Sequence, residues 1–212
     1  MNWELSPSEL SLYLECRRCF YLKMRGMAHR PRPPMPRIFG TIYDHVRFDL
    51  QGMRTELLAA GMPNGIFCYA AERSVKSAAI VLPGRISTCA LRGRFHNLLE
   101  LDAGGYALAD VRICSKNDVP LFGHQLHALS WCLEHPAPGS VSFGQVKEMG
   151  SLLFLPDHFF RLPFFSGALA GRLHWVEIPR DDCNFLEFLS GLVELLDCPA
   201  TPDGAPDCLW CR

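Results

Sequence analysis

The chain has 212 residues, of which 49% are hydrophobic and 20% are charged, and its formal net charge at pH 7 is -1. This length suits one hydrophobic core, and the composition excludes a disordered chain. No apolar run approaches the roughly 18 residues that span a bilayer, and the chain begins with neither a basic segment nor an apolar signal core. We therefore expect a single cytoplasmic domain that does not contact a membrane.

The first expected helix runs from Ser6 to Gly26. Ser6 can cap its start, Pro7 suits the first turn, and Glu9 stands where a capping box places its acid. Gly26 can supply the left-handed residue that ends it. The following segment, residues 29–37, is rich in proline and can only be an extended connector.

The rest of the chain predicts strands and helices in alternation. A second helix is expected over residues 38–60, ending at Gly61, and residues 70–79 lean towards helix. Expected strands cover residues 85–91, 93–101, 106–114, 151–155 and 168–178, with a turn at 102–105, and expected helices cover 118–135 and 181–197. This order predicts an α/β fold with a mixed central sheet flanked by helices.

Basic residues are concentrated near the N-terminus, since no acidic residue occurs between Cys16 and Arg37. A polyanion such as nucleic acid could bind this segment, and a solvated basic surface without a ligand is the alternative at even odds. The candidate nucleic-acid contacts are Arg17, Arg18, Arg30, Arg32 and Arg37.

Two cysteine pairs with the same spacing lie near opposite ends of the chain. Cys16 and Cys19 are three residues apart, and so are Cys208 and Cys211. Four thiolates are the ligand set of a structural zinc ion or of a 4Fe–4S cluster, whereas unpaired thiols packed in the core are the alternative. A shared metal centre would connect the tail to the first helix, and Cys198 could replace one ligand. The remaining cysteines are expected in the core: Cys68, Cys89, Cys114, Cys132 and Cys183.

The first helix and the closing cysteine pair resemble those of RecB-like nucleases of the PD-(D/E)XK superfamily, which include the CRISPR-associated adaptation nucleases. The family's first helix typically reads Ser-x-x-x-x-Tyr-x-x-Cys-Pro-Arg-x-Phe, and residues 16–21 stand at the corresponding places, with Arg17 where the proline would be. The closing CLWC is similar to a cysteine pair that binds a 4Fe–4S cluster in many members. The resemblance implies a PD-(D/E)XK core whose termini are joined by such a cluster, with structural zinc as the alternative.

Further motifs occur in the family's order. Gly40 and His45 are similar to Gly-x-x-x-x-His, the GRFH of residues 93–96 stands where the family has Gly-x-hydrophobic-Asp, and the ADVR of residues 109–112 stands where it has Asp/Glu-x-Lys. The catalytic positions that the resemblance implies are His45, His96, Asp110, Arg112 and Gln125. One domain, residues 1–212, would contain a helical part at 1–61, a sheet core at 85–180, and a C-terminal helix and tail at 181–212.

Three departures from the family pattern alter the implied active site. His96 replaces the metal-binding Asp, Arg112 replaces the Lys, and Leu129 stands where a Tyr often follows the Gln. Magnesium prefers oxygen ligands, and arginine stays protonated and so cannot act as a base. We therefore expect an inactive nuclease-like protein that binds a nucleic-acid backbone, with DNA as the expected ligand. It would act with protein partners in a DNA-processing or CRISPR-related defence complex.

Two other functions remain open from the sequence. His45, His96 and Asp110 could hold manganese or iron in an active nuclease, because these metals accept imidazole. The fold could instead be a scaffold for a protein partner, with Asp110 simply paired to Arg112 or Arg94. Strand register also matters, because a four-residue turn would place Asn97 rather than His96 across from Asp110.

Overall fold

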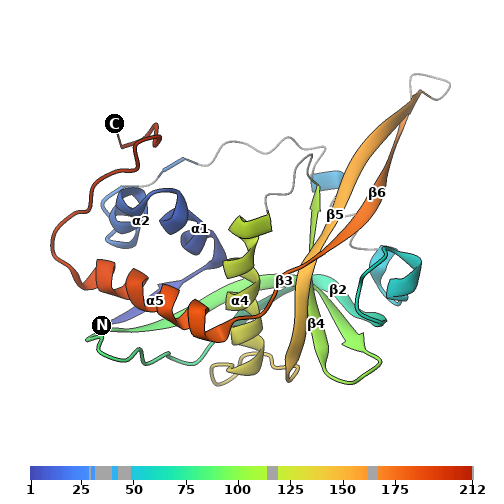
Figure 1. The fold of residues 1–212 in the computed structure, drawn as a ribbon. Helices are drawn as coiled ribbons and strands as arrows, with labels where there is room; N and C mark the ends of the chain where they lie inside the picture. The colour runs from blue at the N-terminus through green and yellow to red at the C-terminus, as the bar shows by residue number, and fades with distance from the viewer. Residues whose placement is uncertain (29, 32–39, 43–48, 114–118, 162–166, 212) are drawn as a thin grey trace.

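A mixed β-sheet with helices gathered against one side forms the body of the protein (Figure 1). The structure is a computed structural model that describes residues 1–28, 30–31, 40–42, 49–113, 119–161 and 167–211. Its named elements are β1 (Asn2–Leu5), α1 (Pro7–Glu15), α2 (Arg17–Met24), the 3-10 helix η1 (Thr55–Leu57), β2 (Gly65–Lys76), β3 (Thr88–Leu101), β4 (Tyr106–Ile113), α4 (Val119–Glu134), β5 (Val146–Arg161), β6 (Gly167–Glu177) and α5 (Asp182–Asp197). No helix in these ranges is both long and apolar enough to cross a bilayer.

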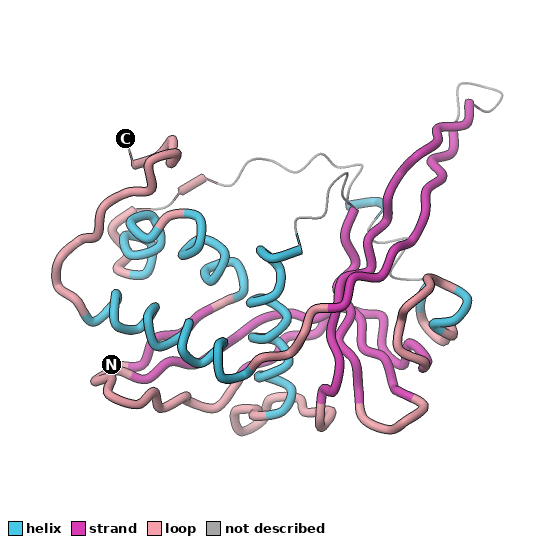
Figure 2. Tube along the Cα trace, in the orientation of Figure 1, coloured by secondary structure: helices cyan, strands magenta, loops and turns pink. Residues whose placement is uncertain are grey.

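The described strands follow the order β1-β3-β4-β5-β6, and β2 pairs with the other edge of β3. β1 lies parallel to β3 and β4 lies parallel to β5, whereas β2–β3, β3–β4 and β5–β6 are antiparallel. The prediction of a mixed sheet flanked by helices is therefore confirmed. The outer part of the β5–β6 ribbon extends well beyond the body of the sheet (Figure 2).

The sheet divides into a fork along β3. β1 pairs with Thr88–Leu91 of β3, and the β4 ladder begins only at Asn97. β2 and the segment that continues it occupy the opposite edge of β3, so β1 and β4 share one edge. Between them, residues 92–95 have a described strand partner on the β2 side alone. This gap, which we call the fork, leaves a stretch of β3 open beside the start of α1.

Apolar cores lie on both faces of the sheet. On one face α1, α2, α4 and α5 pack against the strands, with Leu10, Phe20, Leu126 and Phe185 among the buried side chains (Figure 1). On the other face a smaller core joins the strands to the segment that contains Leu50 and Met62. Burial of this apolar area is the main stabilising contribution to the fold.

Several expected elements differ from the structure. The expected single helix over Ser6–Gly26 is divided at Cys16, although its capping box at Ser6 and Glu9 and the left-handed Gly26 are confirmed. The second expected helix does not continue to residue 60, because the chain turns at Gly52, which has a φ of 78°.

The strands contain the other differences. Residues 70–79, expected to lean towards helix, lie mostly in β2, because pairing with β3 along its length outweighs local helix propensity. In place of the separate strands expected at 85–91 and 93–101, the structure has one continuous strand, β3. β1 was not expected, because its four residues show no strong strand pattern. α5 agrees with expectation, and its capping Asp181 accepts a hydrogen bond from the Asn184 amide at 2.9 Å.

Candidate functional site

Four cysteines from the two ends of the chain meet at one point. The Sγ atoms of Cys19 and Cys211 are 3.1 Å apart, those of Cys19 and Cys208 are 3.5 Å apart, and those of Cys16 and Cys211 are 3.6 Å apart. All four Sγ atoms lie within 4.8 Å of one another. This four-cysteine centre has the donor set of a metal or iron–sulfur site, and it joins the termini as expected.

Cys16 and Cys19 reach the centre from either side of a helix break. The two were expected on one face of a continuous helix, but Cys16 has extended backbone (φ -163°, ψ 109°) and caps the start of α2. Cys19 follows in the first turn of α2. The break therefore changes the direction of the chain, and both thiols still reach the four-cysteine centre.

The tail depends on these thiols for its attachment. Within the described part of the chain, every hydrogen bond between residues 203–211 and the rest of the protein ends on a cysteine sulfur, including one donated by the Ala205 amide to Cys16 at 3.4 Å. Two bonds from Arg25 direct the tail towards α2, since its guanidinium donates to the carbonyls of Leu196 and Cys198 at the end of α5. The tail has little other means of fixing its position.

The thiols of the centre differ in acidity. Burial would raise the pKa of Cys16, but hydrogen bonds from the Ala205 and Cys19 amides and from neighbouring thiols lower it to about 6. Burial and the adjacent thiols raise the pKa of Cys19. One group is thus ready to bind a metal as thiolate, and metal binding would displace the proton of the others.

The other cysteines are not part of the centre. Cys198 is exposed and does not belong to the four-sulfur group, so its suggested role as a replacement ligand is not supported. Cys89 and Cys132 are buried and Cys68 is half-buried, whereas Cys183 is exposed, contrary to the expectation of a core position. Cys114 lies outside the described residues.

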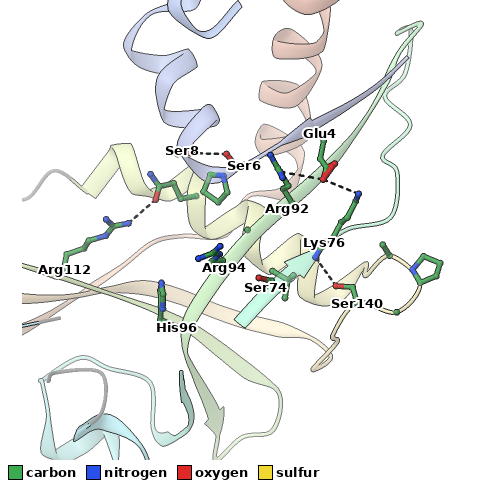
Figure 3. A pocket seen from close by; sticks show the side chains of 17 residues that line it. Glu4, Ser6, Ser8, Ser74, Lys76, Arg92, Arg94, His96, Arg112 and Ser140 are labelled. Carbon is green, nitrogen blue, oxygen red and sulfur yellow. Dashed lines mark hydrogen bonds and ion pairs between the residues drawn. The ribbon is translucent and has the colours of Figure 1, made fainter. Parts of the chain in front are cut away.

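A groove of about 1040 Å³ opens at the fork in the sheet (Figure 3). Its lining includes the start of α1, the end of β2, the open stretch of β3, and a loop at residues 137–140. Gly93 allows this arrangement, because a Cβ there would lie 2.6 Å from the Leu129 side chain and 3.2 Å from Pro7. The side chains that carry or could carry a positive charge here are Lys76, Arg92, Arg94, His96 and Arg112.

A hydrogen-bond chain connects three family positions with α1. Arg112 donates through Nε to Asp110 at 2.5 Å and through Nη2 to Gln125 at 3.0 Å. Gln125 in turn donates to the Ser11 hydroxyl at 2.7 Å. The Arg112 guanidinium thus occupies the space beside Asp110, as the scaffold alternative anticipated for this pair.

The register of the hairpin does not place Asn97 across from Asp110. Glu100 pairs with Tyr106 and Asn97 pairs with Ala109, where the described ladder between β3 and β4 ends. The turn between the strands is therefore one residue longer than the four-residue turn expected at 102–105. Asn97 is buried, and its side-chain amide has no hydrogen-bond partner among the described residues.

The groove's cations have acidic neighbours. Glu4 lies 3.2 Å from the Lys76 ammonium and 3.7 Å from Arg92. Glu72 lies 2.6 Å from Arg94. These ion pairs are largely exposed, and exposed pairs contribute only about 0 to 1 kcal/mol. A stronger anion could therefore displace either carboxylate.

The described arginines near the N-terminus, which were expected to bind nucleic acid, lie outside the groove. Arg17 and Arg18 are exposed on α2, and Arg17 lies 5.4 Å from the Tyr13 ring centroid. Arg30 pairs with Glu15 at 2.7 Å. None of these three lines the groove. Arg32, Arg37 and His45 lie outside the described residues.

Sequence inspection identified His96 but did not identify Lys76, Arg92 and Arg94 as site residues. Arg92, Arg94 and His96 are alternate residues, and alternate residues of a strand share a face. That spacing was available in the sequence, but the expected break between residues 91 and 93 concealed it. Lys76 was missed because its segment was expected to be helical.

Comparisons with known proteins support the fold and add no function. No protein-family model matches the sequence, and no curated protein matches it. Among solved structures, the crystal structure of SSO0001 matches with a TM-score of 0.53 and 13% sequence identity over 94% of this chain and 87% of that chain. At this identity the likeness concerns the overall α/β architecture alone.

Proposed function

We propose that this chain is a PD-(D/E)XK-like protein that binds a nucleic-acid backbone in the fork groove without hydrolysing it. The observation that carries the proposal is the contact of Arg112 with Asp110 and Gln125 at the edge of a groove lined by further cations. Proteins without a working catalytic site usually act through partners. By analogy, this chain would act within a larger DNA-processing or CRISPR-related defence complex.

The contact with Arg112 explains why hydrolysis is not expected. A catalytic magnesium ion needs carboxylate oxygens, and Asp110 already has a permanent positive charge bonded to it. Both partners are only about a quarter exposed, at 29% for Arg112 and 21% for Asp110, so water screens the pair less than an exposed one. His96 supplies no second carboxylate. The Arg112 guanidinium thus places its positive charge beside Asp110, where a metal ion would bind in an active nuclease.

This part of the proposal is tested by exchanging two residues. The protein is expected to show no DNA cleavage in magnesium, manganese or cobalt. The double variant His96→Asp/Arg112→Lys restores a second carboxylate and replaces the planar guanidinium by a flexible ammonium, so it is expected to bind manganese detectably by calorimetry. Asp110→Ala in the same background is the control that should abolish that binding.

Cleavage by the unaltered protein in manganese, lost in Asp110→Ala, would instead establish the alternative function. In that case His45, His96 and Asp110 would hold the metal and the chain would be an active nuclease.

Phosphate binding would exchange the groove's ion pairs for new ones. Arginine binds phosphate through parallel N–H bonds, and lysine binds it as a point charge. Because Glu4 and Glu72 form only exposed pairs with Lys76, Arg92 and Arg94, a row of phosphates can take their place.

This exchange predicts a gain of affinity from loss of an acid. Glu4→Gln is expected to tighten DNA binding by about two- to fivefold at low salt, because Lys76 and Arg92 no longer have to leave a carboxylate. Fluorescence anisotropy with a labelled duplex measures the effect. Glu187→Gln, on the exposed side of α5, removes the same charge elsewhere and should leave the affinity near that of the parent. An equal gain in both variants would show that only net charge matters.

The four-cysteine centre would serve as the structural link between the ends of the chain. We propose a 4Fe–4S cluster as its occupant, on the family resemblance. Zinc is the second candidate, since a single tetrahedral ion with bonds of about 2.3 Å sets its sulfurs roughly 3.8 Å apart, near the spacing found here. Anaerobically purified protein with visible absorption and bound iron supports the cluster, and colourless protein with one zinc ion rejects it.

A further inference from the structure

The described lining of the fork groove has none of the large aromatic side chains that hold unpaired bases, and His96 supplies its one aromatic ring. Proteins that bind single strands stack the bases on aromatic side chains, each worth about 1 to 3 kcal/mol. No Phe, Tyr or Trp stands among the described residues that line the groove. The aromatic side chains closest along the strands turn inward instead: Phe95, between Arg94 and His96, is buried and packs on Tyr69 and Phe143 with ring centroids 5.4 and 5.7 Å away.

Most of the polar side chains that line the groove can donate to phosphate oxygens, and Glu4 is the acidic exception among the described residues. Lys76, Arg92 and Arg94 are supplemented by serine hydroxyls. The Ser140 oxygen accepts a hydrogen bond from the Lys76 amide at 2.9 Å, which leaves its O–H available to donate. Arginine, lysine and serine are the residues that contact the phosphates of a double helix.

The spacing of these donors suits successive phosphates. Arg92 and Arg94 are two residues apart on β3, a separation of about 6.6 Å along the strand. Phosphates on one DNA strand follow every 3.4 Å or so of helix axis, so the two arginines can each meet a different phosphate. Lys76 lies on the neighbouring strand, paired in register with Arg92, and widens the cationic surface across β2 and β3.

We infer that the fork groove takes the sugar–phosphate backbone of a DNA duplex and makes no use of the bases. The inference rests on the proposed nucleic-acid binding and adds the form of the ligand. Without base stacking, only electrostatic attraction remains, and it is stronger for a duplex, which carries a charge every 1.7 Å or so of axis. The paired bases stay inside the double helix, away from the groove.

The experiment measures anisotropy with three DNA probes of equal length: a duplex, a single strand, and a single strand that consists of abasic sites. The duplex is expected to bind about tenfold more tightly than the intact single strand at low salt, because its charge density is higher. The intact and abasic single strands are expected to bind alike, within about twofold, because the described lining of the groove offers no Phe, Tyr or Trp ring for the bases. Unrelated duplex sequences should bind equally.

Three outcomes would overturn the inference, and they separate it from the proposed function. Binding of the intact strand at least tenfold tighter than the abasic strand would mean that bases are contacted, while nucleic-acid binding itself would stand. The same holds for a preference among duplex sequences. If none of the probes binds, both proposals fall. Loss of duplex binding in Arg94→Ala, with Lys147→Ala as the exposed control outside the groove, supports the groove as the place of contact.

Discussion

Cys208→Ser is expected to release the metal or cluster that we propose for the four-cysteine centre and to lower the Tm by about 10 to 20 °C. The centre closes a loop that runs from Cys19 almost to the end of the chain, and closing loops of that size contributes about 4 to 5 kcal/mol. For a domain of this size each kcal/mol corresponds to about 2 to 4 °C. Residues 203–211 also have no other hydrogen bond to the body within the described residues, so this part of the tail should detach when the centre is lost.

Metal analysis and thermal unfolding of the same sample provide the measurement. Cys198→Ser and Cys183→Ser are matched controls, since both thiols are exposed and lie outside the centre, and both variants should keep the metal and the Tm. Limited proteolysis should cut the tail after residue 198 in Cys208→Ser alone. A variant that retains its metal and its Tm would show that Cys208 is not a ligand.

The second large effect is expected in Arg92→Ala/Arg94→Ala, which should bind duplex DNA about 10- to 100-fold more weakly than the parent. Each substitution would remove the contact between one arginine and one phosphate. The slope of log K against log salt should become shallower by about 2, because two fewer counterions are released. Neither side chain supports the core, since both are exposed on the open stretch of β3, and the Tm should therefore change little.

The salt slope distinguishes a role in binding from damage to the fold. Lys147→Ala and Arg54→Ala remove positive charges outside the groove and should leave both the affinity and the slope near the parent values. A double variant that binds with the parent's affinity, or a control that weakens binding equally, would move the contact away from the fork. Arg17 and Arg18 on α2 would then be the next residues to test.

Parts of the candidate site could be predicted from residue spacing alone. The two cysteine pairs indicated a four-thiol centre between the chain ends, and the structure brings all four sulfurs together. Ser6 and Glu9 indicated where α1 begins, because a capping box is a local arrangement of neighbouring residues. Asp110 and Arg112, two residues apart on one strand face, were identified as a possible ion pair.

Other parts could not be predicted, because they depend on partners distant in sequence. The segment of β2 has residues that favour a helix, and only its pairing with β3 makes it a strand. The helix break at Cys16 has no glycine or proline to indicate it. Only the structure shows the extended backbone of Cys16 between α1 and α2.

By itself, the sequence determined what depends on residue types and short spacings: the composition of a globular chain, a mixed α/β order, and two cysteine pairs. The tertiary structure decided what depends on pairing between distant strands. The gap between β1 and β4 opens the fork, and the register of β3 and β4 pairs Asn97 with Ala109 rather than with Asp110. A cationic groove therefore forms where β2, β3 and α1 meet, because side chains far apart in the chain share one surface only after folding.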